Sequence, residues 1–104
     1  MPLADLGHDR ALLVSRWLEL TRQILPEMAA RERWPIRLDH CFMRVCLDTA
    51  MGRRWDEVVQ RPAIRHLTEA ELARAVAVAE SLVRDPGNLP DLNTESLRMR
   101  GRRF

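Results

Sequence analysis

The stretch from Arg37 to Gly52, RLDHCFMRVCLDTAMG, constrains the fold most strongly, because it is the only helical segment that is apolar around most of its circumference. At about 100° per residue, one broad arc of this helix is apolar. A helix of this kind belongs at the centre of a domain. The residues of the arc are Leu38, Cys41, Phe42, Met43, Val45, Cys46, Leu47 and Ala50.

The remaining side of this segment is a narrow polar strip. It either faces water or makes polar contacts in a cleft, and it is the first candidate binding surface. Its residues are Arg37, His40, Arg44 and Asp48.

Asp39 falls on the apolar side of the same helix, where an unpaired carboxylate is costly to bury. The simplest solution is that Asp39 is the N-cap and accepts hydrogen bonds from the amides of Cys41 or Phe42. The helix proper then runs from His40 to Met51. Two alternatives remain open: Asp39 is an ion-pair partner of an arginine such as Arg65, or it is a functional residue.

Composition limits the class of protein. A chain of 104 residues is one domain, and its charged fraction of 31% with a hydrophobic fraction of 46% is ordinary for a folded globular protein. No apolar run is long enough to span a membrane, and the start MPLADLGHDR lacks the pattern of a signal peptide. We therefore expect a cytoplasmic protein without a membrane partner. The net charge of +2 implies no overall field for polyanions.

Helical periodicity recurs along the rest of the chain. One long amphipathic helix is predicted from about Leu6 to Leu25, and from Pro26 to Arg33 it either continues with a kink, which we favour, or gives way to a short second helix. Thr68 and Glu71 form a capping box, which is a strong signal for the start of a further helix.

Shorter helical segments are expected in residues 53–60 and in residues 91–99, and no alternating strand pattern is present. The sequence thus predicts an all-α fold, a compact bundle of three main helices plus two short ones. Residues 1–104 form this single helical domain, with a basic, frayed tail at about residues 98–104.

No convergent catalytic set is visible. His40 and Cys41 diverge by about 100° on a helix, so they cannot act together as a dyad. If the protein is an enzyme, His66 is a further candidate active-site residue together with His40 and Cys41. No spacing suggests metal ligands, and we assign no catalytic residue, metal or cofactor.

The segment around Trp55 carries the remaining candidate binding residues, which are Arg53, Arg54, Trp55, Arg61 and Arg65. Arginines beside an aromatic residue are typical of nucleic-acid binding, but Asp56 and Glu57 follow at once, so a solvated or partner-binding loop is favoured. The leading hypothesis is a small non-catalytic interaction or regulatory protein that binds a protein partner or a second copy of itself. A small helical enzyme and an arginine-mediated nucleic-acid-binding protein are the alternatives.

The stretch WPIRLDHCFMRVCLDTAMGRRWDEVVQRPAIRHLTEAELARAVAVAESLV, about half of the chain, resembles small bacterial proteins that often carry the label GNAT-type N-acetyltransferase. Such an enzyme would be an α/β protein that binds acetyl-CoA at a glycine-rich pyrophosphate loop between a strand and a helix. This chain has neither predicted strands nor that loop, so no activity or site residue is carried over from the resemblance.

Overall fold

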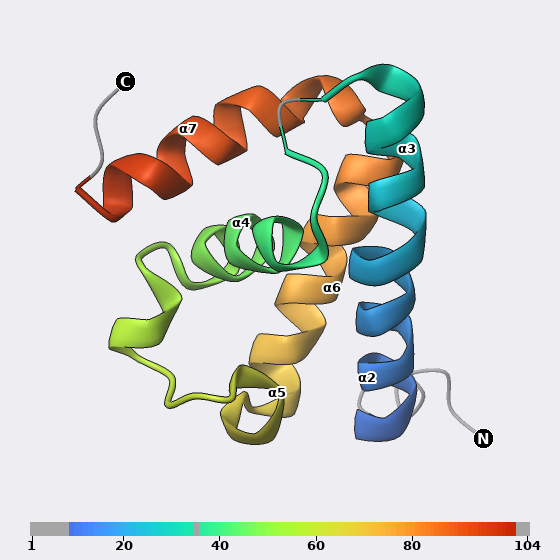
Figure 1. Cartoon of the computed structure of the whole chain (residues 1–104). Coiled ribbons are helices and arrows are strands. Elements are labelled where there is room, and N and C mark those ends of the chain that lie inside the picture. The colour runs from blue at the N-terminus through green and yellow to red at the C-terminus, as the bar shows by residue number, and fades with distance from the viewer. Residues whose placement is uncertain (1–8, 35, 102–104) are drawn as a thin grey trace.

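The computed structural model describes residues 9–34 and 36–101, and this part of the chain consists of helices joined by short turns without any β-strand. The predicted all-α bundle is confirmed. Figure 1 shows α2 to α3 as one long rod beside α6, with α4 lying across α6 and α7 packed against α4. In chain order the elements are α2 (Arg10–Glu19), η1 (Leu20–Ile24), α3 (Leu25–Glu32), α4 (Asp39–Met51), η2 (Trp55–Glu57), α5 (Ala63–His66), α6 (Glu69–Arg84), η3 (Pro86–Asn88) and α7 (Leu89–Met99).

The first rod passes through Pro26 without ending, because its backbone adopts π-helical geometry over η1. Pro26 has no amide hydrogen and cannot donate to the carbonyl group one turn earlier. The Leu25 amide donates to the Leu20 carbonyl, five residues back, which is the π-helical spacing. The favoured continuation of the helix through Pro26 is thus confirmed. The expected start at Leu6 lies outside the described residues, and Asp9 caps α2.

α4 is the central helix, as its apolar circumference predicts. Phe42, Val45 and Cys46 are fully buried, and α4 packs against α6, η1 and α7. The helix ends at Gly52, whose φ of +70° lies in the left-handed region that glycine adopts at little cost. The helix that the sequence predicts to be central is therefore at the centre of the core.

The predicted cap at the start of α4 is wrong by one residue. Leu38 is the N-cap, with extended backbone and a half-exposed side chain that makes no capping hydrogen bond. Asp39 is the first residue of the helix, and its carboxylate accepts a hydrogen bond of 2.8 Å from the His40 amide. The open amides and the dipole of the first turn both favour a carboxylate there. Its nearest arginine is Arg22, at 3.8 Å, and not Arg65.

α6 begins at the predicted capping box. The Thr68 hydroxyl accepts from the Glu71 amide at 3.1 Å, and the Glu71 carboxylate accepts from the Thr68 amide at 2.8 Å. The buried face of α6 packs against both α2 and α4, and its alanines allow a close approach of the helix backbones. The residues of that face are Leu72, Ala75, Val76, Ala79 and Leu82.

The last helix ends at Met99 as expected, but its start and the residue that follows it differ from expectation. α7 begins at Leu89, two residues before the predicted start, because the turn η3 leads directly into it and Leu89 is fully buried. Arg100 belongs to the segment predicted as a frayed tail, yet only 10% of its side chain is exposed and it binds Asp48. Residues 102–104 lie outside the described part of the chain.

Among residues 9–34 and 36–101, three polar side chains are buried, which are Thr21, Asp48 and Ser96. All of them are hydrogen-bonded, and within the described residues no buried side-chain nitrogen or oxygen lacks a partner. Likewise, none of the helices in that part of the chain is long and apolar enough to cross a membrane.

Candidate ligand-binding pocket

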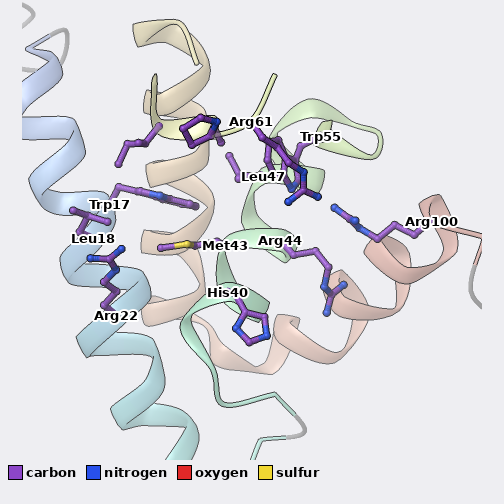
Figure 2. Close-up of a pocket in the computed structure, with 13 residues that line it drawn as sticks. Trp17, Leu18, Arg22, His40, Met43, Arg44, Leu47, Trp55, Arg61 and Arg100 are labelled. Atoms are coloured by element: carbon purple, nitrogen blue, oxygen red, sulfur yellow. The ribbon is translucent and has the colours of Figure 1, made fainter. Parts of the chain in front are cut away.

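A pocket of about 680 Å³ opens between α2, α4, η2, α5 and the end of α7. Figure 2 shows its lining residues as they project from these elements. The size falls within the range of roughly 300–1,000 Å³ that is typical of small-molecule sites. The lining consists of Trp17, Leu18, Arg22, His40, Met43, Arg44, Leu47, Trp55, Arg61, Pro62, Ala63, Ile64 and Arg100.

Most of the lining is apolar. Trp17 comes from α2, whereas Met43 and Leu47 lie one turn apart on α4 and therefore project from the same face. Trp55 comes from η2, and both tryptophans are nearly buried in the core. The two indoles and the side chains between them form an apolar wall suited to an aromatic or aliphatic group.

The polar part of the lining has one sign of charge. Four arginines and one histidine line the pocket, and none of the described lining residues is an aspartate or a glutamate. The drawn side chains in Figure 2 accordingly carry nitrogen at their polar ends. Such a cavity offers guanidinium donors to an anion, although aspartates outside the lining balance part of the charge of Arg22, Arg61 and Arg100. The cationic or potentially cationic residues are Arg22, His40, Arg44, Arg61 and Arg100.

Arg22 reaches the pocket from the π-helical segment η1. Single π-turns in α-helices are frequent at functional sites. The nearest acid is Asp39 at 3.8 Å, and the Arg22 side chain is 59% exposed. An exposed pair at this distance holds the guanidinium weakly, so Arg22 can reorient toward a ligand.

Asp48 lies directly behind the pocket and connects three elements. Its carboxylate is fully buried and accepts hydrogen bonds from the Trp55 amide at 2.9 Å and from the Ser96 hydroxyl at 2.6 Å. Arg100 adds a bidentate contact, with Nε at 2.8 Å and Nη2 at 3.0 Å. This arrangement fixes both Trp55 and Arg100, which line the pocket.

Arg44 extends the same hydrogen-bonded seam between α4 and α7. Its Nη1 donates to Ser96 Oγ and its Nη2 to Asn93 Oδ1, each at 2.7 Å. Asn93, Ser96 and Arg100 lie on one face of α7, at helical spacing. One pocket wall is therefore held by polar contacts between two helices.

Arg61 is positioned by an aromatic ring and by a carboxylate. Its guanidinium carbon lies 5.1 Å from the centre of a Trp55 ring, and its Nη2 donates to Asp56 at 2.8 Å. Arg54 donates to the same carboxylate at 2.7 Å. These contacts, with Arg54 the larger influence, hold the pKa of Asp56 well below its usual range.

The wall formed by α5 is tied to the start of α2. The Arg10 guanidinium donates to the backbone carbonyls of Ile64 and Leu67, at the end of α5. Because the last carbonyls of a short helix lack partners within it, this contact satisfies them and adds a favourable charge. It also fixes Ile64, which lines the pocket.

The residues predicted as a binding surface separate into groups. His40, Arg44, Trp55 and Arg61 line the pocket. Asp48 was expected in a polar strip but lies in the core, because α7 covers that face of α4. Arg54 is outside the lining but donates to Asp56, which also binds the lining residue Arg61. The other three predicted residues are exposed and outside the lining; these are Arg37, Arg53 and Arg65.

The two thiols and His66 lie outside the pocket lining. Burial raises the pKa of the Cys46 thiol to about 12, so it stays protonated at neutral pH. His66 Nδ1 lies 3.1 Å from the Pro62 carbonyl, and no hydrogen bond among the described residues joins a histidine to Cys41. In the same part of the chain, no three His, Cys, Asp or Glu side chains are grouped to hold a metal ion.

No protein-family model, curated protein or solved structure matches this chain.

Proposed function

We propose that this chain is a non-catalytic binding protein whose pocket holds a small organic anion with an apolar body. One observation carries the proposal: the pocket of about 680 Å³ combines an apolar wall with charged lining residues that are all cationic. An apolar body is favoured by its removal from water, and an anionic group by the arginines around it.

Binding rather than catalysis is supported by the residues that line the pocket. In the described lining, His40 is the only residue that commonly acts as a general base near neutral pH, and its side chain is 73% exposed. A nucleophile would need such a base within hydrogen-bond reach. Neither cysteine lies in the lining, so the enzyme hypothesis with His40, Cys41 or His66 is not supported by a shared site.

A small molecule also fits the pocket better than the surface of a protein partner would. The sequence hypothesis of a protein partner used the same residues, but His40, Arg44 and Arg61 line a concavity. For nucleic acid, part of the basic segment is neutralised, since Arg54 and Arg61 both bind Asp56. A gel shift at low salt or a stable homodimer without ligand would favour those alternatives.

The test compares an anionic probe with a neutral probe of the same shape. Anilinonaphthalene sulfonate is expected to bind the folded protein in a single saturable step, at least about tenfold more tightly than uncharged phenylnaphthylamine, because one charged hydrogen bond supplies that difference. Isothermal titration calorimetry measures both affinities. Equal affinity for the two probes, or binding of neither, would contradict the proposal.

A matched pair of variants locates the site. Ala63 lines the pocket, whereas Ala70 is exposed on α6 outside it. Ala63→Phe fills part of the cavity and is expected to weaken sulfonate binding strongly, while Ala70→Phe leaves it unchanged. Circular dichroism confirms that both variants are folded. Equal effects of the two substitutions would place the probe elsewhere.

A further inference from the structure

We infer that Arg61 and Arg100 form the subsite for the anionic group, and that this group is the phosphate of a small monoester with an apolar alcohol. The inference rests on the proposed function and specifies the ligand of the same pocket.

The two guanidiniums are brought together by one chain of contacts. Arg61 lies over Trp55, whose amide donates to Asp48, and Asp48 binds Arg100. Figure 2 shows the side chains of Arg61 and Arg100 pointing toward one another at one end of the pocket, while Arg22 lies across the pocket beside Trp17. Arg61 comes from the loop between η2 and α5 and Arg100 from the end of α7, so they approach from different directions.

Each guanidinium is paired with an aspartate but keeps hydrogen-bond donors. A guanidinium has five N–H donors. Arg100 uses Nε and Nη2 on Asp48, so its Nη1 edge remains, and Arg61 uses only Nη2 on Asp56. The contact with Asp48 fixes Arg100, whose side chain is only 10% exposed, so little conformational freedom is lost there when an anion binds. The Arg61 side chain is 68% exposed, and its contacts with Asp56 and Trp55 orient it more loosely.

A phosphate fits this arrangement better than a carboxylate does. The two coplanar oxygens of a carboxylate match one edge of one guanidinium, as Asp48 already does with Arg100. A phosphate monoester presents three oxygens in tetrahedral directions and up to two negative charges, so it can accept from two guanidiniums that approach from different sides.

The charge balance at this end of the pocket also favours an anion beside Arg61. Arg54 and Arg61 share the single carboxylate of Asp56, so this group of three carries an excess positive charge. Arg100 is balanced by Asp48, which is fully buried and already accepts four hydrogen bonds. An anion at Arg61 is therefore attracted by the excess positive charge of this group.

The apolar wall defines the other part of the ligand. Trp17, Met43 and Leu47 extend from the arginine end toward α2. Such side chains make favourable apolar contacts with a ring or an alkyl chain. They offer few hydrogen bonds to a strongly polar body such as a sugar. The inferred ligand is thus an aryl or alkyl phosphate.

The experiment is isothermal titration calorimetry of the whole chain with naphthyl phosphate, naphthoate and inorganic phosphate. Naphthyl phosphate is expected to bind at least about tenfold more tightly than naphthoate, the difference that one extra charged hydrogen bond provides. It is also expected to bind far more tightly than inorganic phosphate, which lacks the apolar body. Naphthoate binding as tightly as naphthyl phosphate would overturn the phosphate assignment while leaving the proposed function intact.

Three variants test the placement. Arg61→Gln is expected to weaken naphthyl phosphate binding about tenfold or more, and Arg61→Lys to weaken it less, because lysine keeps the charge but not the planar donor fork. Arg74→Gln is the matched control, because Arg74 is exposed on α6 outside the pocket lining, and it is expected to change the affinity less than about twofold. Equal losses in Arg61→Gln and Arg74→Gln would overturn the Arg61–Arg100 subsite. Failure of every anionic probe to bind would instead overturn the proposed function itself.

Discussion

Asp48 of α4 and Arg100, the residue after α7, form a bidentate ion pair, with Nε to Oδ2 at 2.8 Å and Nη2 to Oδ1 at 3.0 Å. The carboxylate is fully buried and also holds the Trp55 amide and the Ser96 hydroxyl. This pair joins the central helix to the last helix and supports one wall of the pocket.

Removal of the Asp48 carboxylate is therefore expected to destabilise the protein severely. Asp48→Ala leaves the Arg100 guanidinium buried without its partner, and such a loss costs about 3–5 kcal/mol in the free energy of unfolding. The control is Arg98→Ala, because Arg98 is exposed on the same helix and its replacement is expected to cost less than about 0.5 kcal/mol. Urea unfolding followed by circular dichroism measures both. Similar small losses would show that α7 is not anchored by this pair.

Asp39 is expected to contribute little. It stands at the first position of α4 with about half of its side chain exposed, so Asp39→Ala should cost no more than about 1 kcal/mol, mainly through the helix dipole and the His40 amide. High salt should reduce that cost, since salt screens exposed charges. A loss of about 3 kcal/mol or more would instead indicate a buried ion pair.

The two thiols should differ in reactivity. Cys46 is fully buried with its pKa raised to about 12, whereas Cys41 is partly exposed. Only thiolate reacts quickly with a disulfide reagent, so the folded protein at mildly alkaline pH is expected to show one faster and one much slower thiol. Cys41→Ser is expected to remove the faster phase, and unfolding in urea to make Cys46 react quickly. Rapid labelling of folded Cys41→Ser would contradict the buried position of Cys46.

Asp56 should make stability sensitive to acid. Its pKa is held below the ordinary value of 3.8 by Arg54 and then by Arg61. A lowered pKa in the folded state means that the unfolded chain binds the proton more readily, so the stabilisation is present above about pH 4 and is lost as pH falls below that value. The variant Asp56→Asn has no ionisable group at this position and therefore lacks this pH-dependent stabilisation.

The corresponding measurement is urea unfolding of the original protein and of Asp56→Asn at several pH values. The gap in the free energy of unfolding between them is expected to narrow as pH falls from about 5 toward the lowered pKa. Glu57→Gln changes the neighbouring exposed acid and serves as the control. A constant gap across this range would mean that the pKa of Asp56 is not lowered in the folded state.

Much of the fold could be predicted from local sequence signals. The apolar circumference of α4 placed it at the centre, and the Thr68 and Glu71 box marked the start of α6, because both signals depend only on residues within one helix. The expected cap at Asp39 missed by one residue, because Leu38 is the N-cap although it makes no side-chain capping hydrogen bond, and a leucine gives no capping signal in the sequence.

The pocket could be predicted only in part. His40, Arg44, Trp55 and Arg61 were candidates because they are polar or aromatic residues in or near the central helix. Arg22 and Arg100 were missed, because their places depend on the π-turn before Pro26 and on the docking of α7. The polar ridge of Asn93, Ser96 and Arg100 was a readable signal, and it matches the ridge of Arg44 and Asp48 on α4. Pairing two such ridges required knowledge of the tertiary fold.

The tryptophans offer the most direct test of the binding site. Trp17 and Trp55 line the pocket, whereas Trp34 packs edge-on against Phe42 outside it, with ring centroids 6.1 Å apart. Each indole N–H gives its own resonance in a heteronuclear NMR spectrum, and Trp34→Phe identifies the control signal by its absence.

The measurement is a titration of the three indole resonances with naphthyl phosphate. The pocket predicts that the Trp17 and Trp55 signals shift together along one saturating curve while the Trp34 signal stays in place, and that naphthalenemethanol, which has no charge, produces much smaller shifts at the same concentrations. Equal shifts of all three signals, a shift confined to Trp34, or no saturable shift at all would contradict the claim that this pocket binds an apolar anion.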